Sequence, residues 1–235
     1  IDIQLDTTLW DRHTLTLGLS HLQQATDQKA DGNYDPNTFA PRPGGYGPIP
    51  RTIPKHSRTI NSVYLQDLIR ITDNVEATLG VRHDDYSNAD GSTNPRAALV
   101  WSINPDTHLK LLHGQAYKTP LVSELYQQNN PRAVGNPNLK PSTINTNEIS
   151  LNHQFTQSVS AQATLFHTRM KDAILESNGT WENAGNQKIQ GSEFEVNLGN
   201  KNESYGYANI TFIDATDADT GEDLPDTANR IANLG

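Results

Sequence analysis

The chain has 235 residues, a formal net charge of -9 at pH 7, 34% hydrophobic residues and no cysteine. The length allows one large all-β domain or two small ones, the lack of cysteine excludes disulfides, thiol catalysis and Cys-based zinc sites, and the acidic balance argues against a nucleic-acid partner. The longest apolar run, about five residues at positions 97–101, is far shorter than the roughly 18 of a transmembrane helix, so a helical membrane protein is excluded.

An apolar residue at every second position is the dominant pattern along the chain, and it predicts strands with one apolar and one polar face. The pattern first occurs at residues 15–19, is clearest at residues 75–82 and returns at residues 149–155, 159–165 and 193–198. Counting all such segments predicts about eleven strands. The pattern also fits a barrel with a polar lumen, because only every second strand residue of such a barrel faces lipid.

The segment around Ala208 departs from this alternation. Tyr205 and Tyr207 fall on one parity, whereas Ile210 and Phe212 fall on the other. The change predicts a β-bulge, or a change of exposed face, near Ala208.

The connections between predicted strands alternate in length. Short ones are expected at residues 10–12, 72–74, 104–106, 156–158 and 199–203, and longer ones at residues 27–55, 87–93, 118–144, 177–186 and 214–228. Short turns on one side and long loops on the other are typical of an up-and-down outer-membrane barrel. A Greek-key sandwich would not keep so regular a rule.

One of the long proline-rich connections carries a recognisable motif. Residues 117–141 read YKTPLVSELYQQNNPRAVGNPNLKP, and their prolines forbid a regular ladder. Together with SVYLQDLIRITDNVEATLGVRHDDYS at residues 62–87 and NAGNQKIQGSEFEV at residues 183–196, this motif resembles the barrel domain of TonB-dependent outer-membrane receptors.

The resemblance implies an all-β fold, an antiparallel up-and-down transmembrane β-barrel that is partial here. About eleven strands would be half of a 22-stranded transporter barrel. Residues 1–235 would then be part of one barrel domain, with the plug domain and the C-terminal strands absent from this sequence. The expected lipid-facing residues are Leu15, Leu17, Val75, Leu79, Val81, Leu151 and Leu165, and those expected on the opposite face are Glu76, Arg82, Glu148, Glu193 and Glu195.

The resemblance also implies a function. A protein of this family in the outer membrane of a Gram-negative bacterium would bind and import a ferric siderophore or similar metal chelate, energised through TonB with ExbB and ExbD. Receptors for cobalamin, haem or an oligosaccharide are alternatives within the family. A passive porin and a soluble β-sandwich adhesin are alternatives from other classes.

An enzyme has little support in the sequence. Glu193 and Glu195 lie on one face about 7 Å apart, but such residues are more often polar lumen wall than a catalytic pair. There is no Gly-x-Ser-x-Gly elbow, His-Glu-x-x-His motif, phosphate loop or dinucleotide fingerprint. We therefore expect neither catalytic residues nor a cofactor.

Long loops are the expected place for ligand contacts, because aromatic faces offer apolar area to a chelate and arginines pair with its anionic oxygens. The predicted contact residues are Tyr46, Arg51, Tyr126, Arg132 and Trp181. For each of them, packing within its own loop or balancing the acidic surface is the alternative. The acidic residues at 214–226 suit calcium in composition but not in EF-hand spacing, which leaves simple solvation as the alternative.

Overall fold

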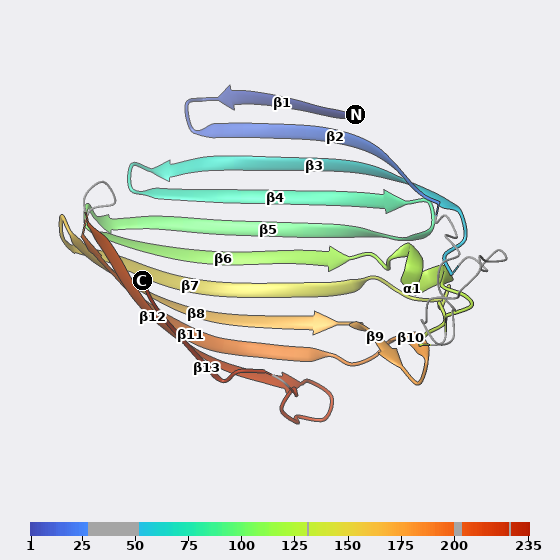
Figure 1. Cartoon of the computed structure of the whole chain (residues 1–235). Coiled ribbons are helices and arrows are strands. Elements are labelled where there is room, and N and C mark those ends of the chain that lie inside the picture. The colour runs from blue at the N-terminus through green and yellow to red at the C-terminus, as the bar shows by residue number, and fades with distance from the viewer. Residues whose placement is uncertain (28–51, 131, 200–203, 226) are drawn as a thin grey trace.

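The computed structural model of the chain describes residues 1–27, 52–130, 132–199, 204–225 and 227–235. The strands are β1 (Asp2–Leu9), β2 (His13–Thr26), β3 (His56–Thr72), β4 (Val75–Tyr86), β5 (Ala89–Asn104), β6 (Thr107–Lys118), β7 (Ser142–Thr156), β8 (Val159–Lys171), β9 (Ile174–Ser177), β10 (Thr180–Asn183), β11 (Gln187–Gly199), β12 (Tyr205–Asp217) and β13 (Arg230–Leu234). Eleven of them form one antiparallel sheet in chain order, in which β8 pairs with β11, and the short β9 and β10 form a hairpin at one end (Figure 1). The predicted number of about eleven strands is confirmed for the large sheet, and β9 and β10 are additional to it.

Because the strands pair in register, the alternation of apolar and polar residues along each strand gives the sheet two chemically different faces. One row across the sheet is apolar from β4 to β13, whereas the adjacent row on the other face is mostly polar. The apolar row is Val75, Trp101, Leu109, Leu151, Ala163, Phe194, Ile210 and Ala232. The other row is Arg70, Glu76, Val100, Lys110, Ser150, Thr164, Glu193, Thr211 and Ile231. The predicted division of residues between the two faces is confirmed.

The pattern of burial is the opposite of that in a soluble protein, because apolar side chains are exposed and polar side chains are buried. On the apolar face Leu79 is 51% and Leu165 is 57% exposed, whereas Ser62, Asp84 and Ser150 on the polar face are buried. The polar face is therefore the inner one, and the apolar face has no protein partner within the described residues. A soluble monomer rarely exposes so large an apolar surface, and lipid is the solvent that suits it. The β-sandwich alternative is wrong, because the described strands form one large sheet and a small hairpin rather than two packed sheets.

The apolar band on the outer face runs obliquely across the strands. Near β1, the row of Leu5, Leu17, Leu65 and Val81 is apolar. The next row towards the short turns becomes polar from β6 onward, where it contains His113, Asn147, His167, Gln190 and Asp214. On β8 and β12 the band therefore lies closer to the turns and ends at Leu165 and Phe212. A level lipid layer crossing tilted strands produces such a pattern.

The connections confirm the predicted sidedness and correct one length. Residues 10–12, 73–74, 105–106 and 157–158 join strands at one end of the sheet, and the long loops lie at the other end. The connection predicted to be long at residues 87–93 is residues 87–88 only, since Tyr86 pairs with Ala89. Pro95 does not end β5, because the β5–β6 ladder stops at Arg96 and makes this part of β5 an edge, where a strand tolerates proline.

The bulge predicted near Ala208 is wrong. The ladder between β11 and β12 is continuous from Gly199 paired with Tyr205 to Gln187 paired with Asp217. Tyr205 and Tyr207 are simply tyrosines on the polar face. Within the described ranges, no helix is long and apolar enough to cross a membrane.

Candidate ligand-binding surface at the loop end

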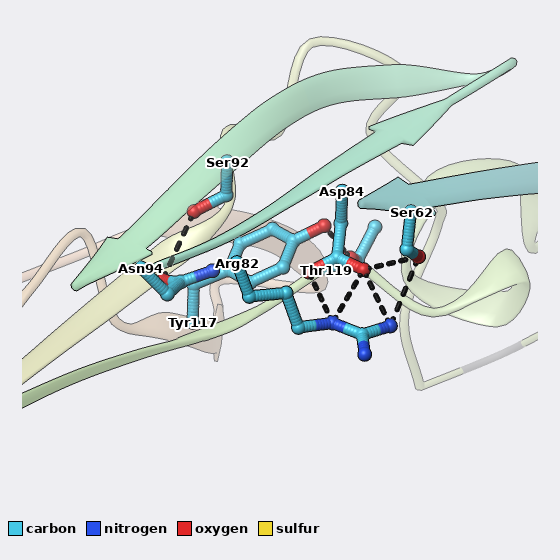
Figure 2. Close-up of polar contacts among 7 residues, drawn as sticks. All are labelled: Ser62, Arg82, Asp84, Ser92, Asn94, Tyr117 and Thr119. Atoms are coloured by element: carbon cyan, nitrogen blue, oxygen red, sulfur yellow. Dashed lines mark hydrogen bonds and ion pairs between the residues drawn. The ribbon is translucent and has the colours of Figure 1, made fainter. Parts of the chain in front are cut away.

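A polar cluster lies on the inner wall of β3 and β4 below the long loops, and Figure 2 shows its members side by side. The Nε of Arg82 donates to both carboxylate oxygens of Asp84, at 2.9 and 3.0 Å, and its Nη2 donates to the Oγ of Ser62 at 2.9 Å. The Oγ of Ser62 donates in turn to Asp84 at 2.5 Å. The Asp84 side chain is 6% exposed and that of Arg82 is 46% exposed, so a buried carboxylate holds a half-exposed guanidinium at the wall.

Aromatic and cationic side chains continue this wall toward the loops. The rings of Tyr86 and Tyr117 meet edge to face with centroids 5.6 Å apart, and Thr119 Oγ1 donates to the Tyr117 hydroxyl at 3.0 Å. The guanidinium of Arg58 lies 5.7 Å from the Tyr86 ring centroid and donates to the carbonyl of Pro120 at 3.3 Å. Arginine and aromatic faces are thus presented together at the loop end of the inner wall.

Large side chains lie flat on this wall because glycines on adjacent strands leave room for them. A Cβ on Gly18 would lie 2.0 Å from the Tyr64 ring, and one on Gly191 would lie 2.1 Å from the Phe212 carbonyl oxygen and 2.6 Å from the Phe166 ring. The Tyr64 hydroxyl donates to Gln4 at 2.7 Å, which fixes the ring across Gly18. Such glycines are required for close approach and not for backbone freedom.

The loop after β6 is anchored by an ion pair between a half-exposed lysine and a buried glutamate. It contains the short helix α1 (Val122–Tyr126), and the Lys118 ammonium lies 2.8 Å from Glu124 Oε1, whose side chain is 5% exposed. The other carboxylate oxygen of Glu124 accepts the backbone N–H of Leu121 at 2.7 Å and closes the start of the helix. Removing Lys118 would leave the buried Glu124 carboxylate without its ion-pair partner at the end of β6.

The same loop joins the β9–β10 hairpin in one packed unit. Val134 forms a bridge with Thr180, the Nδ2 of Asn136 donates to the Trp181 carbonyl at 2.9 Å, and Asn183 Oδ1 accepts the N–H of Lys140 at 2.7 Å. A hydrophobic cluster fills the space between the two segments. Its buried members are Leu125, Leu139 and Ile174, with Tyr126 and Trp181 packed against them.

The structure brings two of the five predicted contact residues together. Tyr126 and Trp181 are both half-buried against the loop cluster, and the Tyr126 ring lies 4.4 Å from the ring of His56 at the start of β3. The buried indole nitrogen of Trp181 has no hydrogen-bond partner among the described residues. Arg132 is exposed on the same loop, and its backbone N–H is accepted by Asn130 Oδ1. Tyr46 and Arg51 lie outside the described residues.

The predicted ligand contacts did not include Arg58 or His56, which contact the loop after β6, or Tyr86, which lies beneath Arg58. Alternation assigns a residue to a face but says nothing of its contacts with a loop some 60 positions away. Arg82 had been placed on the polar face, and its spacing of two from Asp84 was the available signal for their pairing.

Two carboxylates at the acidic loop after β12 accept hydrogen bonds from backbone and side-chain N–H groups. Asp217 Oδ1 accepts the N–H groups of Asp219 and Thr220 at 2.8 and 2.9 Å, and these bonds lower the pKa of the Asp217 carboxyl, which lies beyond the apolar band. Asp219 accepts the side-chain amide of Asn186. The described residues contain no group of three His, Asp or Glu side chains placed to hold a metal ion.

Residues 1–235 match the family model described as TonB dependent receptor-like, beta-barrel. The chain is 29% identical over 136 residues to a probable TonB-dependent siderophore receptor PirA of Acinetobacter baumannii, which covers 52% of this chain and 18% of that protein. It is also 29% identical over 160 residues to a hemin receptor of Yersinia pestis, which covers 56% of this chain and 23% of that protein.

Solved structures show the same fold. The siderophore receptor PirA of Acinetobacter baumannii superposes with a TM-score of 0.75 at 20% identity, covering 99% of this chain and 38% of that one. A ferric enterobactin receptor of Pseudomonas aeruginosa, solved with enterobactin, superposes with a TM-score of 0.74 at 19% identity, again over 99% of this chain and 38% of the other. The chain therefore spans well under half the length of these relatives.

Proposed function

The chain belongs to the TonB-dependent receptors through their β-barrel domain, and we propose that it forms part of a receptor that binds and imports a ferric siderophore or similar metal chelate. The observation that carries this proposal is at the loop end of the inner wall, where Arg58 lies over the Tyr86 ring and donates to the carbonyl of Pro120 in the loop after β6. Arginine forks pair with anionic oxygens, and aromatic faces cover the apolar part of a chelate. The proposed contacts remain Tyr46, Arg51, Tyr126, Arg132 and Trp181.

The site would act by binding alone, without transforming its ligand. The protein would lie in the outer membrane of a Gram-negative bacterium, because the apolar band of the barrel requires lipid. Energy for import would come through TonB with ExbB and ExbD. A passive porin fits less well, because the whole chain matches a receptor family.

Haem is the second candidate ligand. The hemin receptor of Yersinia pestis is as similar to this chain as the siderophore receptor is, at 29% identity. Haem has a flat apolar face that suits Tyr126 and Trp181, and two carboxylates that suit arginine. Cobalamin and oligosaccharide have no comparable support among the relatives named above.

A competition experiment tests the proposal. The full-length receptor that contains this chain, purified in detergent, is titrated by intrinsic fluorescence with a ferric catecholate, a ferric hydroxamate, hemin and cyanocobalamin. We expect saturable binding of one ferric chelate, with hemin competing weakly. Saturable binding of hemin alone would select the second candidate, and binding of none of the four would contradict the proposed function.

A further inference from the structure

Two cationic side chains face each other on the outer face of β8 and β11. Arg169 stands directly opposite Lys188 in the register, and Lys171 lies two residues further along β8 on the same face. Like charges directly opposite each other in an antiparallel pair repel. None of the ion pairs between described residues involves these three side chains, which we call the cationic patch.

The surroundings of the cationic patch do not neutralise it. Asn145 stands opposite Arg169 on β7, and Thr216 stands opposite Lys188 on β12. Asp214, an acid on this face of β12, accepts the side-chain amide of Gln190 at 2.8 Å. In a chain whose net charge is -9, the patch is thus a local concentration of positive charge that lacks an anionic partner among the described residues.

The position of the patch indicates what the partner is. The apolar band ends at Leu165 on β8 and at Phe212 on β12, and Arg169 and Lys171 follow four and six residues after Leu165, toward the long loops. A side chain just beyond a lipid-facing band lies at the level of the lipid headgroups. We propose that the cationic patch binds the phosphate of a lipid headgroup in the leaflet on the long-loop side.

The chemistry of the patch fits this ligand. A guanidinium offers a planar fork to two phosphate oxygens, and each lysine adds a compact charge. The acyl chains of the same lipid would cover Leu165, which is 57% exposed, and Phe194, which is 48% exposed. The inference requires only that the apolar face meets lipid, so it does not depend on which chelate the receptor takes.

The test uses the full-length receptor in a nonionic detergent, titrated with dioctanoyl phosphatidic acid and followed by native mass spectrometry. Dioctanoylglycerol, which lacks the phosphate, and inorganic phosphate, which lacks the chains, are the two comparison ligands. We expect phosphatidic acid to bind more tightly than either. Equal binding of dioctanoylglycerol would show a purely apolar contact, and equal binding of inorganic phosphate would show an anion site without lipid character; either result overturns the proposal.

The double variant Arg169→Gln with Lys188→Gln should weaken binding of phosphatidic acid at least about tenfold, because two charge-assisted contacts are lost. The matched control is Arg70→Gln with Lys110→Gln, which removes the same charge from the polar face and should leave the affinity unchanged. Unchanged affinity in the patch variant contradicts the proposal.

Two further measurements cover the case in which the double variant fails to assemble. Arg169→Lys preserves the charge and should retain most of the affinity. Binding by the unaltered receptor should weaken as salt is raised from about 0.05 M to about 0.5 M, because partly exposed charges are screened. Affinity that does not change with salt overturns the proposal. Chelate binding should be unaffected in all these variants, which separates this inference from the proposed function.

Discussion

The Nδ1 of His13 lies 2.7 Å from the Oδ2 of Asp67 on the outer, apolar face of the sheet. Asp67 interrupts the apolar band on β3, where the outward residues on either side are Ile69 and Leu65. Its other carboxylate oxygen is buried and has no partner among the described residues. One oxygen of the Asp67 carboxylate therefore lacks a hydrogen bond, on a face where an unpaired polar group destabilises the folded barrel.

The pair predicts unequal effects of its two single substitutions. Asp67→Leu should leave the free energy of unfolding unchanged or raise it, since it removes an under-satisfied acceptor from an apolar surface. His13→Leu should lower it by about 1 to 3 kcal/mol, because it removes the described partner of the carboxylate. Urea unfolding of the full-length receptor in phosphatidylcholine bilayers measures both.

The double variant provides the control. In the Asp67→Leu background, His13→Leu should lower the free energy of unfolding far less than in the unaltered protein. The reason is that no carboxylate remains to lose its partner. Equal costs in the two backgrounds would show that the 2.7 Å contact carries no coupling.

A second prediction uses the two faces of β4. Leu79→Arg places a guanidinium in the apolar band and should cost about 2 to 4 kcal/mol at mid-depth, whereas Thr78→Arg places it on the polar wall. Leu79→Arg should therefore block assembly far more than Thr78→Arg. Heat-modifiable gel mobility of the assembled barrel distinguishes them, and equal tolerance of the two changes would contradict the orientation of the sheet.

The strands and their faces could be predicted because alternation is a local pattern. Val75 and Leu79 lie on the same face of β4 because they are an even number of residues apart, and this holds without any knowledge of the neighbouring strand. The first residue of β5 could not be predicted, since Pro95 argues locally against a strand and is tolerated only because β6 no longer pairs with that part of β5.

The loop unit was beyond sequence reasoning for a different reason. The β9–β10 hairpin and the loop after β6 are held together by contacts such as that of Val134 with Thr180, which join segments far apart in the chain. Tyr126 and Trp181 were selected as aromatic loop residues. Their burial against Leu125 follows from a packing that no local pattern encodes.

A third prediction concerns the flat inner wall. Gly18→Ala places a methyl group 2.0 Å from the Tyr64 ring and should cost about 1 to 3 kcal/mol through overpacking. Gly114→Ala is the matched control, because nothing lies within 4 Å of its added Cβ, and it should be neutral or slightly stabilising. The free energy of unfolding in bilayers measures both.

Removing the ring should rescue the first variant. With Tyr64→Ala in place, Gly18→Ala should cost little, since the group it displaces is gone. If Gly18→Ala still lowered the free energy of unfolding in this background, Gly18 would be needed for its backbone conformation and not to leave room for the Tyr64 ring.

The last prediction concerns the ligand contacts on the loops. Replacing Arg51 and Arg132 together with Ala in the full-length receptor should weaken binding of an anionic ferric chelate at least about tenfold, because a hydrogen bond to a charged group contributes about 1.5 to 3 kcal/mol. Arg132 is exposed on the loop that packs with the β9–β10 hairpin, and a rigid support of this kind positions a side chain for binding. The control is Arg70→Ala, which removes a cation from the polar wall at the opposite end of β3. Barrels shown to be inserted are compared by fluorescence titration. Equal affinity of the double variant and the unaltered receptor would remove these two arginines from the site, while the family assignment, which depends on the whole chain, would stand.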